Sequence, residues 1–351
     1  METRRLEEIL SKFSQTKVAV LGDFFLDLYI QMDRALSEFS IETHKEAFQA
    51  VGFRGQPGAA GVVTNNLSSL GAQHGVVGYI GHDGNGYTLR NALAERGANT
   101  AHLIETSDRF TPTYTKPMMK ELDGGNVELN RIDIINRSPN PDSLNALLVE
   151  HLQAALISYD GILVVEQVKQ DGFGAMSPTL RQFLSDLAGQ NPDKVVMVDS
   201  RHFASVYRNI SLKMNIHEAA SAVAEVTGQS HNVSLADLIT TSDQYANILW
   251  DIQKRPIFLT LGEQGVCGVE NGQYFHLPGY QLEGPIDIVG AGDSVLAGIG
   301  LALCAGATSL EAAYIGNLVG SITVQQLGTT GVATQKDVLR RHHEYQHQIR
   351  G

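Results

Sequence analysis

Short apolar runs alternate with helical patterns along almost the whole chain, and this alternation constrains the fold more than any other feature of the sequence. The runs are rich in valine, isoleucine and leucine, which is typical of strands covered on both faces. The predicted strands are residues 17–21, 74–80, 159–165, 194–198 and 256–261. Strands and helices in alternation predict an α/β fold with a doubly wound, mostly parallel sheet.

Helical patterns fill the intervals between these strands. Ser177 is followed by a proline, the pattern of an N-cap and a first helical position, and predicts a helix that reaches Leu187. Apolar residues at helical spacing predict further helices over residues 143–157 and 234–252. We therefore expect a single domain over residues 1–351.

Two segments depart from this pattern and alternate apolar and polar residues with a period of two. They lie within about residues 24–56 and 110–135, and the second contains the turn Asp123-Gly-Gly-Asn126. These strands lie outside the βαβ progression, so we expect a small separate sheet that acts as a lid over an active site. Decorative hairpins are the alternative. Because unpaired strand edges invite pairing, we also expect a homodimer through the lid.

Composition and charge exclude several classes of protein. The formal charge of −12 argues against a nucleic-acid or anionic-membrane partner, since both require a basic surface. The charged N-terminal stretch has no signal-peptide core, and no apolar run reaches the roughly 20 residues that span a bilayer. The two cysteines, Cys267 and Cys304, form no disulfide framework. A soluble cytoplasmic protein is expected.

The segment Asp287-Ile-Val-Gly-Ala-Gly-Asp293 is the strongest chemical signal in the chain. It runs into a helix that is apolar on every face, which places Gly290, Ala291 and Gly292 at the helix N-terminus. Small residues there let backbone amides approach a phosphate. Beside such an anion site, Asp293 makes sense as a base that takes a proton from an attacking hydroxyl. Capping of the helix by Asp293 is the alternative.

This segment resembles the C-terminal signature of the PfkB family, which includes ribokinase, fructokinases and adenosine kinase. Within that family, the chain is similar to the heptose-phosphate kinase domain of bacterial ADP-heptose synthases over roughly residues 15–340. The motifs that carry the likeness are residues 21–27 (LGDFFLD), 57–61 (PGAAG), 66–71 (NLSSLG), 130–133 (NRID), 213–218 (KMNIHE), 260–263 (TLGE), Asn317 and 327–329 (LGT). The resemblance implies a ribokinase-like fold that binds ATP and Mg²⁺.

Further site residues follow from the resemblance, motif by motif. Asn215 and Glu218 match an Asn-x-x-Glu motif, would share one helix face, and would hold waters of a Mg²⁺ ion. A solvated Glu218 is the alternative. The likeness assigns nucleotide binding to four residues: Lys213, Thr260, Gly262 and Asn317. Asp287 resembles part of a loop that binds a monovalent cation such as K⁺, and a loop-structuring role fits it equally.

The departures from the family pattern cluster on the acceptor side. The residues assigned to substrate are Asp23, Asp27, Gly58, Lys116, Arg131 and Lys169, and the basic ones would hold a phosphate already on the sugar. Taken singly, each basic residue also fits a solvated surface charge. The chain departs from the family at Ala59 (for glycine), at Val62 (for a sugar-binding asparagine) and at Val289 (for a hydroxyl residue), and Val289 is expected to be buried.

Together these features predict an ATP-dependent phosphotransferase that acts on a hydroxyl of a sugar or sugar phosphate, heptose-phosphate-like. A non-catalytic or weakly catalytic sensor of sugar or nucleotide is the alternative. A dehydrogenase is disfavoured because the first strand ends in Gly22-Asp-Phe-Phe instead of Gly-x-Gly-x-x-Gly. A P-loop kinase is excluded because the chain has no Gly-x-x-x-x-Gly-Lys-Ser/Thr segment.

Overall fold

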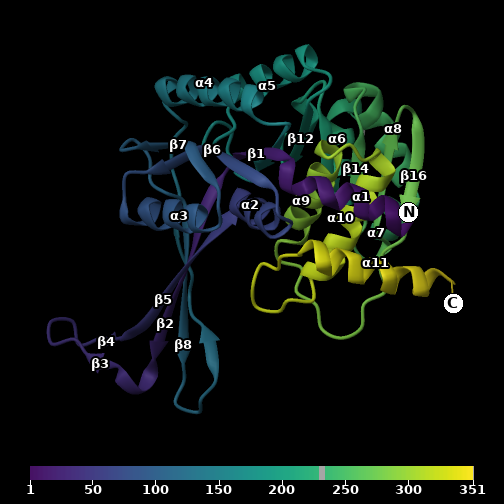
Figure 1. Cartoon of the computed structure of the whole chain (residues 1–351). Helices are drawn as coiled ribbons and strands as arrows, with labels where there is room; N and C mark the ends of the chain where they lie inside the picture. The colour runs from purple at the N-terminus through teal and green to yellow at the C-terminus, as the bar shows by residue number, and fades with distance from the viewer. Residues whose placement is uncertain (229–233, 351) are drawn as a thin grey trace.

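The computed structural model describes residues 1–228 and 234–350, and its centre is a nine-stranded sheet with helices on both faces (Figure 1). The strand order is β16 (Gln273–Leu277), β15 (Val266–Glu270), β14 (Ile257–Thr260), β13 (Ser211–Asn215), β12 (Val195–Ser200), β11 (Gly161–Glu166), β1 (Lys17–Gly22), β6 (Gln73–Gly81) and β7 (Asn99–Thr106). Neighbouring strands from β7 to β14 are parallel, and β15 and β16 are antiparallel. The predicted mostly parallel sheet is confirmed.

Each face of the sheet has its own apolar core. The helices of one face are α1 (Thr3–Lys12), α2 (Ala60–Ser69), α3 (Gly84–Glu95), α9 (Ala291–Cys304), α10 (Ser309–Thr323) and α11 (Gln335–Arg350). Those of the other are α4 (Asp142–Ser158), α5 (Pro178–Gln190), α6 (Ile216–Thr227), α7 (Leu235–Thr240) and α8 (Ser242–Gln253). Burial on both faces explains why the strands are continuous apolar runs.

The helix predictions are confirmed for α4 and α5 and wrong in one place. Ser177 caps α5 by accepting from the Leu180 amide, as expected. Residues 234–252 form two helices instead of one, because the backbone at Thr241 leaves the helical region (φ −101°, ψ 14°). Both the amide and the hydroxyl of Thr241 donate to the Asp237 carbonyl, and α7 ends there.

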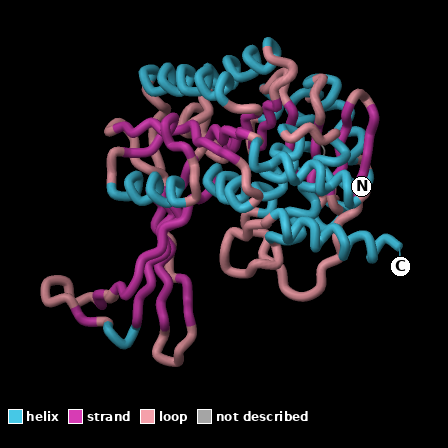
Figure 2. The backbone as a smooth tube through the Cα atoms, in the orientation of Figure 1, coloured by secondary structure: helices cyan, strands magenta, loops and turns pink. Residues whose placement is uncertain are grey.

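A second sheet projects from the body, as the magenta strands of Figure 2 show. It contains β10 (Ile132–Ile134), β8 (Thr113–Lys120), β2 (Phe24–Asp33) and β5 (Ala50–Ala59) in this order, with β9 (Asn126–Glu128) on β8. A hairpin of β3 (Glu38–Phe39) and β4 (Glu46–Ala47) extends it. The predicted separate sheet is confirmed, and we call it the lid. Its β2–β8 pair is parallel, and its other pairs are antiparallel.

Continuous backbone joins the lid to the body. Only Asp23 separates β1 from β2, and β5 runs directly into α2. Gly22, at the first junction, has φ +148°, and a Cβ there would lie 2.1 Å from the Val165 carbonyl oxygen, so only glycine fits. Ala59, at the second junction, has φ +52° and ψ −118°, a conformation that residues with a Cβ rarely adopt. The two junctions between the lid and the body are therefore short and conformationally constrained.

Candidate active site

The turn Gly290–Gly292 opens the buried helix α9. Gly290 is the N-cap, has φ +78°, and no side chain caps the helix. A Cβ on Gly290 would lie 3.1 Å from Val62 Cγ1 and 3.3 Å from Thr330 Cγ2, so α2 and the loop before α11 support the turn. The first-turn amides of α9 are thus free of a side-chain cap, which suits an anion.

Asp293 lies in the first turn of α9 and does not cap it, so the capping alternative is excluded. Burial raises the pKa of Asp293 to about 7, and the nearby charge of Asp199 adds to the shift. Lys213 and Arg201 act in the opposite direction. A carboxylate whose pKa lies near neutrality is suited to general base catalysis.

Lys213 lies in the middle of β13, with its ammonium next to the turn Gly290–Gly292. Its Nζ is 2.6 Å from Asp199 Oδ2 and would be 2.9 Å from a Cβ on Gly292. Burial lowers the pKa of Lys213, but Asp199, Asp293 and Glu218 outweigh burial and the pKa is raised. The ammonium is therefore a fixed positive charge directly under the anion site. Asp199, at the end of β12, was not singled out from the sequence.

Asn215 and Glu218 form a reciprocal capping box at the start of α6. Asn215 Oδ1 accepts from the amides of His217 and Glu218, and Glu218 Oε2 accepts from the Asn215 amide. Burial, and then the charge of Asp199, raise the pKa of Glu218, so this side chain is not simply solvated. Its Oε1 has no hydrogen bond among the described residues.

The carboxylates of Glu218 and Asp199 fit a magnesium ion that is bound mainly by phosphates and water. Within the described residues no three carboxylate, histidine or cysteine side chains gather as metal ligands. Glu218 Oε1 and Asp199 Oδ1 have no hydrogen bond within the described residues, and Mg²⁺ commonly keeps several waters next to one or two carboxylates. Glu218, through water, is the residue best placed to hold it.

The predicted nucleotide residues Thr260, Gly262 and Asn317 lie at the end of β14, in the turn after it and on α10. Thr260 ends β14 and its hydroxyl donates to the Met214 carbonyl at 3.4 Å. Gly262 has φ +61° in the turn that follows. Asn317 of α10 donates to the Pro278 carbonyl at 2.8 Å and so anchors the loop that leads to α9.

Asp287 holds two loops together. Its carboxylate accepts from the amides of Val289 at 3.0 Å and Gly328 at 3.1 Å. This geometry supports the loop-structuring interpretation, and a role in cation binding stays a prediction. In Figures 1 and 2 the loops on either side of α9 and α10 project from the same side of the body as the lid.

A cavity of about 240 Å³ lies between the base of the lid and the ends of β1 and β11. Its walls include Phe24, Phe25, Tyr114, Lys169, Phe173 and Arg201. Parallel sheets bind ligands at the carboxyl ends of their strands, and this cavity has that position. It is the candidate acceptor site.

The two aspartates assigned to the acceptor have different surroundings. Asp23 is buried and accepts from the amides of Gln167, Val168 and Ala175 at 2.7–3.1 Å, so it holds a loop in place. A free Asp23 carboxylate facing a sugar, as expected from the sequence, is not what the structure has. Asp27 Oδ1 pairs with the lid residue Lys116 at 3.1 Å. A Cβ on Gly58 would lie 2.9 Å from Asp27 Oδ2, so Gly58 makes room for this carboxylate.

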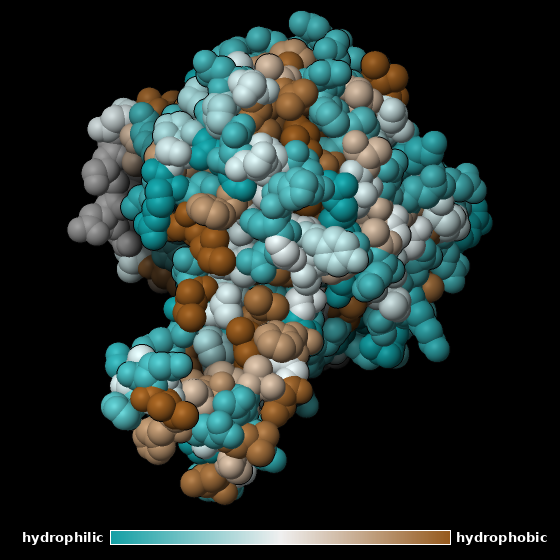
Figure 3. Space-filling model, turned by 90° about the vertical axis from the view of Figure 1, so that its left-hand side faces the viewer, coloured by the Kyte–Doolittle hydropathy of each residue, from teal (hydrophilic) through white to brown (hydrophobic). Residues whose placement is uncertain are grey.

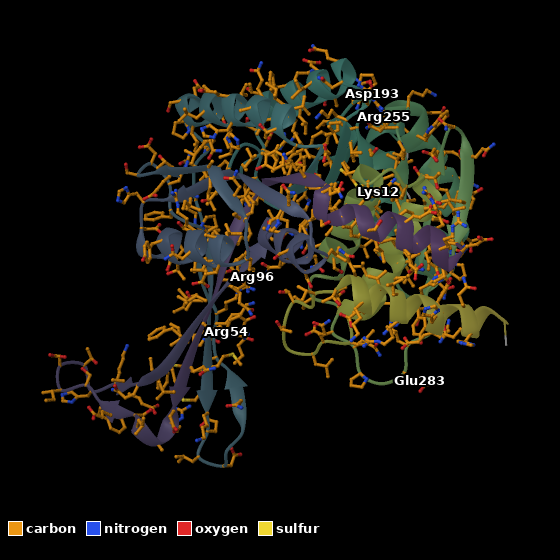
Figure 4. The ribbon with its side chains drawn as sticks, in the orientation of Figure 1. Lys12, Arg54, Arg96, Asp193, Arg255 and Glu283 are labelled. Carbon is orange, nitrogen blue, oxygen red and sulfur yellow. The ribbon has the colours of Figure 1, made fainter. Side chains whose placement is uncertain are left out.

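Basic and aromatic side chains line the lid above Asp27. Lys116 lies 4.8 Å from the ring centroid of Tyr29, and Arg131 lies 4.4 Å from that of Tyr114 and pairs with Asp133. Figure 4 labels Arg54, which stacks on Tyr29 at 4.3 Å, and Glu283 on the loop that leads to α9. The predicted lid cations are thus held in place by aromatic rings.

Two cations of the cavity have no ion pair or side-chain hydrogen bond within the described residues. Lys169 and Arg201 are exposed, line the cavity, and come from the loops after β11 and β12. Burial, and then the charges of these two residues, lower the pKa of His202 beside them. Arg201 was missed in the sequence, where a strand end followed by one arginine carries no distinctive signal.

The three departures from the family pattern have different surroundings. Val62 is buried against Gly290, and Ala59 lies at the junction between β5 and α2. Val289 is 61% exposed and its neighbour Ile288 is 72% exposed, so the expectation of a buried Val289 is wrong. The loop tethered by Asp287 turns these side chains outward, and the sequence pattern of a helix entry did not show this.

Comparison with known proteins identifies the family to which this chain belongs. The model of the "pfkB family carbohydrate kinase" matches residues 15–336. The chain belongs to this family. It is therefore an ATP-dependent carbohydrate kinase with a ribokinase-like fold, as the sequence predicted. No helix in the described part of the chain is long and apolar enough to cross a membrane.

Among relatives, "Bifunctional protein HldE" of Trichlorobacter lovleyi is 29% identical over 340 residues, which are 95% of this chain and 64% of the relative. HldE of Caulobacter vibrioides is 30% identical over 90% of this chain and 62% of its own length. The chain thus spans less than two thirds of the length of these relatives.

Solved structures show the same fold at low identity. Ribokinase from Cryptococcus neoformans, in complex with ADP, has a TM-score of 0.65 and 19% identity and covers 93% of this chain and 99% of its own. Phosphofructokinase-2 from Escherichia coli, in complex with fructose-6-phosphate, has a TM-score of 0.66 and 15% identity. The match covers 94% of this chain and 99% of the phosphofructokinase chain.

Proposed function

We propose that this kinase phosphorylates a hydroxyl of a sugar that already carries an anionic group, such as a heptose phosphate or another sugar phosphate. The supporting observation is that Lys169 and Arg201 line the cavity without an ion pair or side-chain hydrogen bond among the described residues, and that Arg201 is near enough to Asp293 to lower its pKa. A neutral sugar offers nothing to balance them. A phosphate group accepts charge-assisted hydrogen bonds, which are the strong ones. Phosphofructokinase-2 from Escherichia coli, which shares the fold, was solved in complex with fructose-6-phosphate, a sugar phosphate.

In the proposed reaction Asp293 takes the proton of the acceptor hydroxyl. The oxygen forms a bond to the γ-phosphorus of ATP, the bond from that phosphorus to the β–γ bridging oxygen breaks, and ADP leaves with the electron pair. The amides of the turn Gly290–Gly292 and the Lys213 ammonium stabilise negative charge on the transferred group. Thr260, Gly262 and Asn317 would bind the nucleotide.

A bound Mg²⁺ would supply further charge neutralisation on the β- and γ-phosphates. Glu218, oriented by the capping box with Asn215, would hold its waters. A monovalent cation such as K⁺ would bind the loops that Asp287 joins. Full activity is then expected in K⁺ and reduced activity in tetramethylammonium, and equal rates in both would remove the K⁺ proposal.

The acceptor is tested by ADP release with ATP, Mg²⁺ and a panel of acceptors. The panel contains heptose 7-phosphate, fructose 6-phosphate, hexoses, ribose and nucleosides. Because two charge-assisted bonds contribute about 1.5–3 kcal/mol each, kcat/KM for a phosphorylated sugar should exceed that for its free form by at least about 10²-fold. Equal kcat/KM values would contradict the anionic acceptor. No acceptor-dependent ADP release at all would favour the sensor alternative.

We also propose that the lid pairs with the lid of a second copy. Brown, hydrophobic residues gather on the projecting lid in Figure 3. Phe39, Ile41 and Phe53 are 77%, 89% and 70% exposed, and open strand edges accompany them. Exposed apolar surface on a strand edge favours association with another chain.

A further inference from the structure

A buried cluster of polar side chains at the ends of β11 and β12 has no part in the chemistry above. Glu166 and Arg181 are 2% and 5% exposed and form an ion pair of 2.7 Å. Ser200 and Tyr207 donate to the other carboxylate oxygen of Glu166 at 2.6 and 2.9 Å. The cost of removing two charges from water offsets much of such a pair's stabilising effect, so fold stability alone does not explain the cluster.

The cluster reaches the loop between β11 and α5. Arg181 Nη1 lies 2.8 Å from Asp171 Oδ1, and Nη2 donates to the Met176 carbonyl at 3.3 Å. Asn140 and Tyr79 hold the same loop by bonds to its backbone, in addition to the three bonds to Asp23. Lys169 lies between these tethers, so its backbone is fixed while its ammonium is free.

The same cluster reaches the end of β12 on its other side. The Arg201 amide donates to the Glu166 carbonyl at 3.1 Å, and the Phe203 amide donates to Ser200 Oγ at 3.1 Å. The Arg181 guanidinium stacks on the Phe203 ring at 3.9 Å. Arg201 therefore stands on a segment that is anchored to the same ion pair as the Lys169 loop.

We propose that the Glu166–Arg181 pair positions two cations for the anionic group of the acceptor, Lys169 through Asp171 and Arg201 through Ser200. This inference rests on the proposed function. Both cations have long, flexible side chains, and ordering them on binding costs free energy. A backbone that is already fixed on both sides of the cavity reduces this cost. Glu166, Arg181 and Asp171 are thus positioning residues for acceptor affinity and do not touch the reacting atoms.

The test uses Asp171→Asn, because this change leaves the buried pair intact and the fold at little risk. Asp171 is half-exposed, with 50% of its side chain accessible. Asp171→Glu keeps the carboxylate and serves as the conservative variant. Asp186→Asn is the matched control, since Asp186 is an exposed aspartate on α5 that bonds only Gln182 among the described residues.

Two readouts separate this proposal from the proposed function. Hydrogen exchange of the amides in residues 167–176 should become roughly three- to tenfold faster in Asp171→Asn, unchanged in Asp186→Asn, and largely restored in Asp171→Glu. KM for fructose 6-phosphate or heptose 7-phosphate, whichever is turned over, should rise by a similar factor while KM for ATP and kcat stay constant. Unchanged exchange, or equal shifts of both KM values, would overturn the inference. The exchange result stands even if no acceptor is found.

Discussion

At the scale of single residues, Asp293 is a carboxyl group in surroundings that partly disfavour its ionised form. Burial and the charge of Asp199 disfavour ionisation, while Lys213 and Arg201 favour it, and the balance gives a pKa of about 7. Because the pKa of Asp293 is raised in the folded state, its contribution to stability is lost as pH rises from its ordinary value of 3.8 to about 7, and the ionised form needed for catalysis carries the full cost. Catalytic groups are commonly placed in such conflicting surroundings.

The pH dependence of kcat/KM follows from this pKa. The base must be ionised in the free enzyme, so kcat/KM should be constant well above pH 7 and fall about tenfold per pH unit well below it. The measurement is initial rates between pH 5 and pH 9, with a substrate whose own ionisation is known. A rate that is flat down to pH 5 would contradict the assignment of this pKa to the base.

Replacement of Lys213 tests the electrostatic balance. Lys213→Met removes the cation that lowers the pKa of Asp293, so the inflection in kcat/KM should move to higher pH. KM for ATP should also rise several-fold, because the charge under the turn is lost. An unshifted pH profile with a changed KM would assign Lys213 to nucleotide binding alone.

The sequence predicted the positions of individual residues where a motif determines the local backbone conformation. The turn Gly290–Gly292 lies where its small residues suggested. The sequence did not reveal Asp199 or Arg201, because they follow strands without a distinctive spacing and become site residues only when β12 is placed next to β13 and β11. Asp23 lines the candidate acceptor cavity, but its carboxylate oxygens accept hydrogen bonds from three backbone amides. No sequence pattern indicates that a carboxylate will be bound by backbone amides in this way.

At the scale of elements, strand positions were predictable because burial on both faces imposes a continuous apolar run. The break between α7 and α8 was not, since residues 234–252 keep helical spacing across Thr241. The backbone conformation at the junction between the lid and α2 could not be predicted from the sequence either. Ala59 occupies a positive-φ position that glycine would adopt without strain.

Ala59→Gly should therefore stabilise the protein. Relief of an unfavourable φ of a non-glycine residue contributes about 1–3 kcal/mol, less roughly 0.5–1 kcal/mol for the greater freedom of glycine in the unfolded chain. The measurement is denaturant unfolding of both proteins. Ala60→Gly is the matched control, because Ala60 lies in α2 and should lose stability. A lower free energy of unfolding in both variants would show that the backbone at Ala59 is not strained.

At the scale of the whole molecule, the body carries the donor chemistry and the lid carries part of the acceptor cavity and the exposed apolar surface. If two lids pair, Phe53→Asp should convert a dimer into a monomer. Tyr87→Asp is the matched control, since Tyr87 is 71% exposed but belongs to α3 of the body. Sedimentation at micromolar concentration distinguishes the species. A wild-type monomer, or a dimer that survives Phe53→Asp, would contradict lid pairing through this residue.

The most direct test of the central claim is turnover by Asp293→Asn. The amide preserves shape and hydrogen bonding but cannot take the acceptor proton, so kcat should fall by at least about 10²-fold. ATP with Mg²⁺ should raise the Tm of the variant as much as that of the wild type, because nucleotide binding is intact. Near-normal phosphorylation of the acceptor by Asp293→Asn would contradict the account.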